Sequence, residues 1–329
     1  MLNKHSNLAF FIPHLGCPYR CIFCDQNNIS GEKSIIKPDE VRDTCDKFLL
    51  ADGSDTEIAF FGGSFTAIPR ELMVSFLEAA FPFVEQGRAA GIRLSTRPDC
   101  IDDEILTILK KYGVTSIELG AQSMDDHVLR LNGRGHTSQH VREASELIRS
   151  YGFALGLQMM VGMYGTDDPK KDALYTAEEF IKLSPVTVRI YPTLVVENTV
   201  LADLYRSGRY IPLELENAVE ISSELIRMFR DADINVIRVG LHSEESLQEQ
   251  TLAGPFHPAF GELCESMILR NQILTDAGEA KDILIRCNPR FISKIIGQKK
   301  SNISFFRNKG ISIKVIQDPS IEEYIIEHP

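Results

Sequence analysis

Hydrophobic and polar positions follow two different periods along the first 240 residues of the chain. Short runs rich in β-branched and aromatic residues predict strands, and between them apolar residues recur every three or four positions, as on one face of a helix. The strand pattern occurs at residues 8–12, 57–61, 92–96, 116–120, 154–161, 187–191 and 235–239. The helical pattern occurs at residues 38–50, 70–84, 102–111, 138–150, 170–183 and 215–231.

Strands that alternate with helices predict a parallel sheet built from βα units. Six or more such units within about 230 residues favour a complete or partial (β/α) barrel over a small open sheet. The pattern becomes irregular and then helical between residues 241 and 278, and we expect this segment to close the barrel. The sequence therefore predicts an α/β fold, a partial barrel, with residues 1–278 as its first domain.

The C-terminal segment has a different pattern, which predicts a small α+β domain over residues 279–329. A strand, two helices and a strand are expected there, at residues 283–287, 289–296, 301–309 and 311–316. Charge also separates the two parts. Residues 1–280 have 26 Lys/Arg and 41 Asp/Glu, a net −15, whereas residues 281–316 have nine Lys/Arg and one acid, a net +8. A contact with a polyanion is therefore expected at the C-terminal domain.

The composition, 43% hydrophobic and 25% charged, is that of an ordinary globular protein. No apolar run approaches the roughly 18 residues of a membrane span, and the N-terminal segment has no small-residue cleavage site. Seven cysteines, three of them clustered, are typical of a protein that uses thiolates in a reducing compartment. We therefore expect a cytoplasmic protein with no membrane partner.

The clustered cysteines, Cys17, Cys21 and Cys24, form a C-x3-C-x2-C motif in HLGCPYRCIFCDQ, directly after the first predicted strand. Thiolates at such short spacings can surround one iron–sulfur cluster. Three cysteines leave one iron of a 4Fe–4S cubane open, which is useful only if a substrate or cofactor binds there. A structural zinc site would need four ligands, usually as paired CxxC units, and the other four cysteines are isolated. The motif therefore favours a cluster over zinc.

With Phe23 before its last cysteine, the motif resembles the signature of the radical S-adenosylmethionine (SAM) superfamily. This resemblance extends over residues 7–275, which are similar to the radical SAM domain of the Elongator catalytic subunit, a tRNA wobble-uridine acetyltransferase. The similarity lies in FIPHLGCPYRCIFCDQ, FFGGSFTA, LSTRPD, ELGAQS, GRGHT and VRIYPTLVV. The coproporphyrinogen dehydrogenase branch has similar QS…R-x-H arrangements and is the second resemblance.

The resemblance implies that the three clustered cysteines bind a 4Fe–4S cluster and that SAM chelates its open iron. An electron from a flavodoxin or ferredoxin would then split SAM into methionine and a 5′-deoxyadenosyl radical, which abstracts hydrogen from the substrate. SAM would be bound at the carboxyl ends of the barrel strands. The residues implied in this binding are Phe23, Gly62, Gly63, Ser64, Ser95, Gln122, Arg134, Gln158 and Tyr191.

The implied roles differ among these residues. The two glycines would hold the methionine amino group, Arg134 the carboxylate, the two glutamines the ribose and Tyr191 the adenine. The chain departs from many relatives at Ser64 and Ser95, where an acid is common. Considered singly, the glycines would form a tight turn, Arg134 would be a surface cation and Tyr191 would fill the core. His136 and His257 are weaker candidates for contacts with the substrate.

The segment ISKIIGQKKSNI resembles a KH domain, which clamps an RNA backbone between two helices joined by a GxxG loop. Lys300 stands in place of the second glycine. Gly297, Lys299 and Lys300 are therefore the expected RNA contacts. The alternative is an accessory domain that packs on the barrel and has a basic face.

These features favour a radical SAM enzyme that acts on tRNA or another RNA. The acetyl-CoA half of the Elongator reaction is not carried over, because the segment after the barrel resembles a KH module. Two alternatives remain. One is an enzyme like coproporphyrinogen dehydrogenase that acts on a small molecule, and the other is an iron–sulfur regulator that binds RNA.

Overall fold

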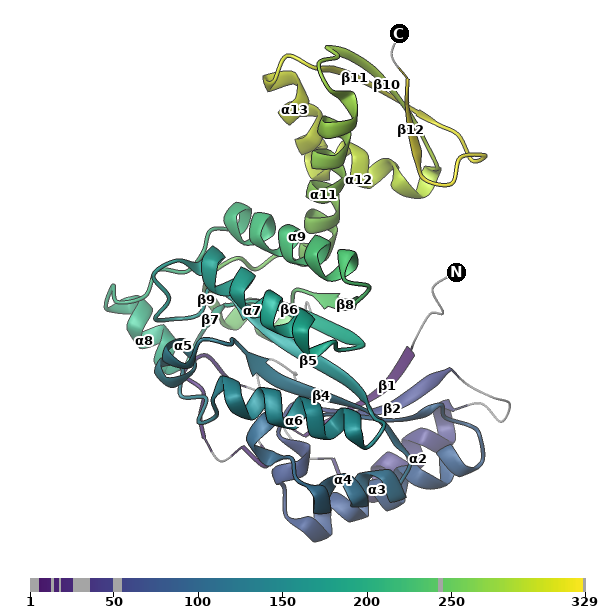
Figure 1. Ribbon diagram of the computed structural model, residues 1–329, viewed down its shortest axis with the longest axis vertical. Coiled ribbons are helices and arrows are strands. Elements are labelled where there is room, and N and C mark those ends of the chain that lie inside the picture. Colours follow the sequence, from purple (N-terminus) through teal and green to yellow (C-terminus); the bar gives the residue numbers. More distant parts are fainter. Residues whose placement is uncertain are drawn as a thin grey trace.

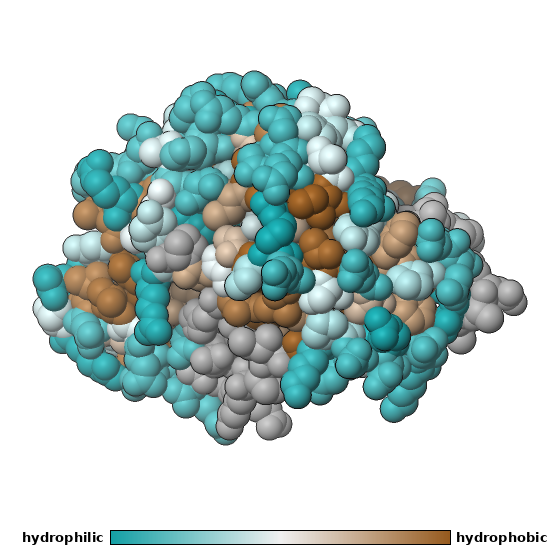
Figure 2. Space-filling view, turned by 90° about the horizontal axis from the view of Figure 1, so that it is seen from below, coloured by the Kyte–Doolittle hydropathy of each residue, from teal (hydrophilic) through white to brown (hydrophobic). Residues whose placement is uncertain are grey.

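The computed structural model describes residues 6–12, 15–17, 19–25, 36–49, 55–241 and 245–327. A curled sheet with helices on its outer face forms the larger part of the molecule, and a small domain stands at one end of it (Figure 1). Seen along the long axis from the opposite end, the surface is mostly hydrophilic, with hydrophobic side chains gathered near the middle and at one side (Figure 2). No helix within the described residues has the length and hydropathy to cross a membrane.

Seven parallel strands form the curled sheet in the order β1-β2-β3-β4-β5-β6-β8. Their bounds are Ser6–Phe11 (β1), Thr56–Phe61 (β2), Gly91–Thr96 (β3), Val114–Gln122 (β4), Ala154–Val161 (β5), Thr187–Pro192 (β6) and Asn235–Val239 (β8). All seven match strands expected from the sequence, and the partial barrel is confirmed. Because β1 and β8 are the two edges of this sheet, the barrel is open between them.

The connecting helices cover the outer face of the sheet (Figure 1). They are Pro38–Phe48 (α2), Arg70–Glu85 (α3), Asp103–Lys111 (α4), Ser138–Ser150 (α6), Pro169–Leu183 (α7) and Leu215–Asp231 (α9). Each lies within two residues of its expected range. The start of α4 shows why: the Asp102 carboxylate accepts a hydrogen bond from Ile105 N at 2.7 Å and so satisfies a free amide of the first turn.

The sequence patterns did not predict several short elements. They are Asp126–Leu131 (α5), Val195–Val196 (β7), Val200–Arg206 (α8), Glu245–Gln250 (α10) and Thr251–Ala253 (β9), and β7 pairs with β9 in an antiparallel ladder. Elements of two to seven residues are too short to show a hydrophobic period.

The small C-terminal domain has the expected strand–helix–helix–strand order and one further strand. Its elements are Asp282–Cys287 (β10), Ile292–Ile296 (α12), Ser301–Asn308 (α13), Ser312–Gln317 (β11) and Tyr324–Glu327 (β12). In the sheet order β11-β10-β12, the middle strand is parallel to β11 and antiparallel to β12. β12 was not predicted because acidic residues flank its three apolar positions.

One helix, Phe260–Ala277 (α11), connects the two parts and contributes to both cores. Phe260 and Met267 belong to the barrel core, whereas Ile273 and Ala277 pack in the core of the small domain. The buried Asn302 amide of α13 adds hydrogen bonds to backbone oxygens of α11 and α12, at 3.0 to 3.2 Å. The expected boundary after residue 278 thus falls at the end of a helix that is also a wall of the second domain.

Candidate active site

A cavity of about 460 Å³ lies inside the curl of the sheet, and all seven strands contribute to its wall. This volume is in the usual range of about 300–1,000 Å³ for small-molecule sites. The twelve residues assigned by resemblance to the cluster and SAM all line it: Cys17, Cys21, Phe23, Cys24, Gly62, Gly63, Ser64, Ser95, Gln122, Arg134, Gln158 and Tyr191. The carboxyl ends of parallel strands meet at one side of the barrel, which explains why residues so far apart in the sequence converge.

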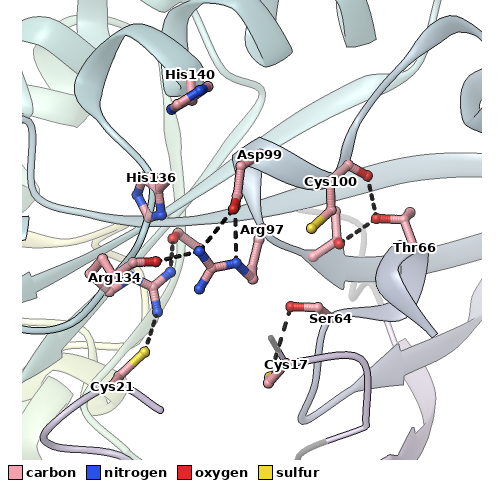
Figure 3. A network of polar contacts seen from close by, with 12 residues as sticks. Cys17, Cys21, Ser64, Thr66, Arg97, Asp99, Cys100, Arg134, His136 and His140 are labelled. Atoms are coloured by element: carbon pink, nitrogen blue, oxygen red, sulfur yellow. Dashed lines mark hydrogen bonds and ion pairs between the residues drawn. The ribbon is translucent and has the colours of Figure 1, made fainter. Parts of the chain in front are cut away.

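The three cysteines lie at the mouth of the cavity on the loop after β1. Cys17 is exposed, and Cys21 and Cys24 are partly buried. Cys17 Sγ is 3.9 Å from Ser64 Oγ, and Cys21 Sγ accepts a hydrogen bond from Arg134 Nη1 at 3.0 Å. The two thiols therefore face different walls of the opening (Figure 3). Within the part of the chain that the structure describes, no three His, Cys, Asp or Glu side chains are arranged to hold a metal ion.

Arg134 is buried beside these thiols. Its Nη2 donates to Gly120 O, and its Nε has no hydrogen-bond partner among the described residues. A buried N–H without an acceptor is unfavourable, so the site offers a donor to an anionic ligand. A carboxylate suits the planar guanidinium.

Arg97 holds the surroundings of Arg134 in place. It forms a bidentate ion pair with Asp99 at 2.9 and 3.0 Å and donates to the backbone oxygen of Arg134 (Figure 3). Its guanidinium also lies over the ring of Tyr19, 5.2 Å from the centroid. Arg97 thus links the end of β3 to the cysteine loop and to the loop of Arg134.

The glycine pair after β2 lets the cysteine loop approach closely. A Cβ at Gly63 would lie 2.4 Å from Leu15 O and 2.7 Å from Ile12 O. Gly62 has φ 93°, which favours glycine. Ser64 N donates to Leu15 O at 3.0 Å. Gly62 and Gly63 therefore form the expected tight turn, and with Ser64 they also line the cavity across from Arg134 (Figure 3).

Gln122 has a backbone conformation that is uncommon for a residue with a side chain. Its φ is 73°, and the ladder between β4 and β5 is irregular at this position. The side-chain amides of Gln158 and Gln122 are 3.4 Å apart. Left-handed residues other than glycine cost of order 1 kcal/mol and cluster at ligand sites. Gln122 therefore combines strain with a position in the cavity wall.

The two candidate histidines do not face this cavity. His136 is buried, its Nε2 is 3.1 Å from Ala121 O, and burial, with a contribution from Arg134, lowers its pKa from the ordinary 6.5 to about 3. It is a neutral residue of the barrel wall. His257 lines a small neighbouring pocket that shares Pro192 with the main cavity.

A row of charged side chains that crosses neighbouring strands of the sheet was not recognised in the sequence. Arg93 forms ion pairs with Glu57 at 2.5 Å and with Glu118 at 3.1 Å. Arg189 donates to both carboxylate oxygens of Glu118, at 2.5 and 2.9 Å. Glu118, Arg189 and Arg238 line the cavity. The detectable sign was the presence of single charged residues inside otherwise apolar strands.

Two models of known protein families match the chain. The Radical SAM superfamily model matches residues 11–176, about half of the chain, and the Radical SAM C-terminal domain model matches residues 185–270. The chain therefore belongs to the radical SAM superfamily. Proteins of this superfamily bind a 4Fe–4S cluster and SAM. In this chain the three thiols, the Gly62-Gly63 turn and the unpaired Nε of Arg134 line one cavity, and thiolates and a guanidinium are the kinds of group that such ligands require.

Among individual proteins, the chain is similar to the tRNA uridine(34) acetyltransferase of Dehalococcoides mccartyi, 36% identical over 39% of this chain and 28% of that protein. It is 28% identical to mouse Elongator complex protein 3 over 52% of this chain and 35% of that protein. The structure of archaeal Methanocaldococcus infernus Elp3 superposes with a TM-score of 0.65 at 20% identity, over 81% of this chain and 63% of that one. The chain thus matches about a third or less of these two sequence relatives, and the structural likeness shows the fold.

Proposed function

We propose that this chain is a radical SAM enzyme that acts on tRNA or another RNA. The observation that carries the proposal is the convergence of all twelve assigned residues on one cavity of the barrel. The RNA substrate is supported by similarity to tRNA uridine(34) acetyltransferases and by the basic C-terminal domain.

In this proposal the cysteines hold the cluster, while the Gly62-Gly63 backbone and Arg134 bind the amino and carboxylate groups of SAM. When bound, the cluster and SAM would together supply reductive cleavage of the SAM sulfonium, with one electron from a flavodoxin or ferredoxin, and this would generate a hydrogen-abstracting radical. The protein orients SAM through Arg134, whose own position is fixed by Gly120 O and Arg97. Buried apolar wall residues such as Phe23 and Met160 exclude water from the reaction.

The C-terminal domain is proposed to be a KH-like RNA anchor. Lys299 and Lys300 have φ 51° and 61° and lie at the start of α13, where free amides point outward. A Cβ at Gly297 would lie 2.5 Å from Ser301 Oγ, so the loop requires a glycine there. These features offer amide donors and two lysines to a phosphate backbone.

The first test is SAM cleavage. Anaerobically reconstituted protein treated with dithionite should release 5′-deoxyadenosine, measured by chromatography, even without RNA. Protein that retains a complete cluster but releases none would favour the iron–sulfur regulator instead.

The second test is tRNA binding by filter retention over a salt series. Lys299→Glu with Lys300→Glu should weaken binding and flatten the salt dependence, because fewer counterions are released. The control reverses two exposed barrel lysines, Lys47→Glu with Lys111→Glu, and should bind tRNA like wild type. Equal curves for the two double variants, or no binding by wild type at low salt, would favour the small-molecule enzyme.

A further inference from the structure

Arg238, on edge strand β8, lines the main cavity but is not among the residues assigned to the cluster or to SAM. The side chain is half-buried, and burial lowers the pKa of its guanidinium; repulsion from Arg189 acts in the same direction, and the nearby Tyr191 acts against it. A positive charge in such surroundings is unfavourable unless an anion lies beside it.

The described residues offer Arg238 no such anion. Its hydrogen bond within them is made by Nε to Gly240 O, at 3.3 Å. Glu118 is the one carboxylate among the described lining residues, and it is already shared by Arg93 and Arg189. The two outer nitrogens of Arg238 thus have no partner in the part of the chain that the structure describes.

The strand register gives the place of this charge. Arg189 of β6 and Arg238 of β8 are direct neighbours on parallel strands. Two like charges in that position repel. Glu118 pairs with Arg189 and Arg93 and forms no ion pair with Arg238 among the described residues. Tyr191 lies two residues further along β6, about 7 Å nearer the cysteine end. Arg238 and Asn7 lie on the two edge strands, β8 and β1, and both line the cavity. Arg238 therefore lies beside the opening between these strands.

We propose that Arg238 binds a phosphate group of the RNA, next to the nucleotide that enters the cavity through this opening. The proposal rests on the RNA substrate proposed above and adds a second contact point to the one on the C-terminal domain. A guanidinium fork matches two phosphate oxygens. Every internal nucleotide in RNA has a phosphate on each side, so an anion is present wherever an internal base reaches the cavity. Phosphate contacts of this kind set the position of a nucleic acid.

The experiment uses the anaerobically reconstituted full chain with SAM, and total tRNA as the probe. Filter retention over a salt series should show about tenfold weaker binding for Arg238→Gln, with a salt slope smaller by about 0.7 to 0.9. Arg238→Lys, which keeps the charge, should keep the slope. The matched control is Arg227→Gln, an exposed arginine on the outer helix α9, with wild-type affinity and slope.

A second measurement on the wild type avoids any effect of substitution on folding. Phenylglyoxal, which modifies arginine, should react with Arg238 in the free protein and more slowly in the tRNA complex, as followed by peptide mass spectrometry. Arg227 should react equally in both. If wild type binds tRNA but Arg238→Gln has the same affinity and slope, or Arg238 is not protected, the inference is wrong and the proposed function stands. If wild type does not bind tRNA, the RNA function itself fails.

Discussion

Replacing Gly156 by Ala would test the row of charges in the barrel. Gly156 of β5 is paired with Glu118 of β4, and the Glu118 side chain crosses over it to reach Arg189 on β6. A Cβ at Gly156 would lie 2.8 Å from Glu118 Cγ and 3.0 Å from Thr187 Oγ1. The φ of Gly156 is not in the left-handed region, so the substitution acts through this contact and not through the backbone.

The expected loss of stability has two sources. Overpacking a core by one methyl group costs about 1–3 kcal/mol. Moving the Glu118 carboxylate also lengthens its pairs with Arg93 and Arg189, and a broken buried pair costs about 3–5 kcal/mol. Because the pairs would be stretched and not lost, we expect the free energy of unfolding to fall by about 3 kcal/mol.

Urea denaturation followed by far-UV circular dichroism measures this change. Gly261→Ala in α11, where the nearest atom to the new Cβ is Val239 O at 3.3 Å, is the control and should change stability by under about 1 kcal/mol. In a Glu118→Gln background the second substitution should be milder by about 2 kcal/mol, because the ion pairs are already lost. A Gly156→Ala protein within about 0.5 kcal/mol of wild type would refute the packing argument.

Three further predictions concern the site. Arg134→Ala should weaken SAM binding by about 10- to 100-fold in equilibrium dialysis, because a charge-assisted pair is lost, and unchanged affinity in the folded variant would contradict its assigned role. Alanine at any of the three motif cysteines should abolish binding of about four iron and four sulfide. The Cys45→Ala variant should retain them, because Cys45 is a buried thiol whose pKa is raised by burial to about 12. Tight zinc binding instead would rule out the cluster. Because His136 has a pKa of about 3 when folded and 6.5 ordinarily, its neutral form stabilises the fold above pH 6.5, and this stability is lost as pH falls towards 3. Relative to His136→Gln, wild type should therefore lose up to about 1.4 kcal/mol per pH unit in chemical denaturation below pH 6.5, and parallel curves would count against a buried neutral His136.

Most of the barrel could be predicted from the sequence. Its helices and longer strands show a hydrophobic period over eight or more positions, and its shorter strands lie between clear turns. The cluster and SAM residues were found because they belong to motifs with fixed spacing. Glu118, Arg189 and Arg238 were missed because pairing across strands depends on register, which periodicity does not give. The left-handed backbone of Gln122 was missed for a similar reason: it results from an irregularity in a ladder and not from the local residue type.

Because α11 runs without a break from one domain into the other, its length determines the direction and the distance of the small domain from the barrel. Each residue of an α-helix adds about 1.5 Å and turns the chain by about 100°. One residue inserted between Met267 and Ile273 would swing the small domain to another side of the barrel, whereas seven would move it about 10 Å outward with nearly its original orientation. In the proposed enzyme, this single helix would act as a spacer, and its length would determine how many nucleotides separate the anchored part of the RNA from the nucleotide that reacts.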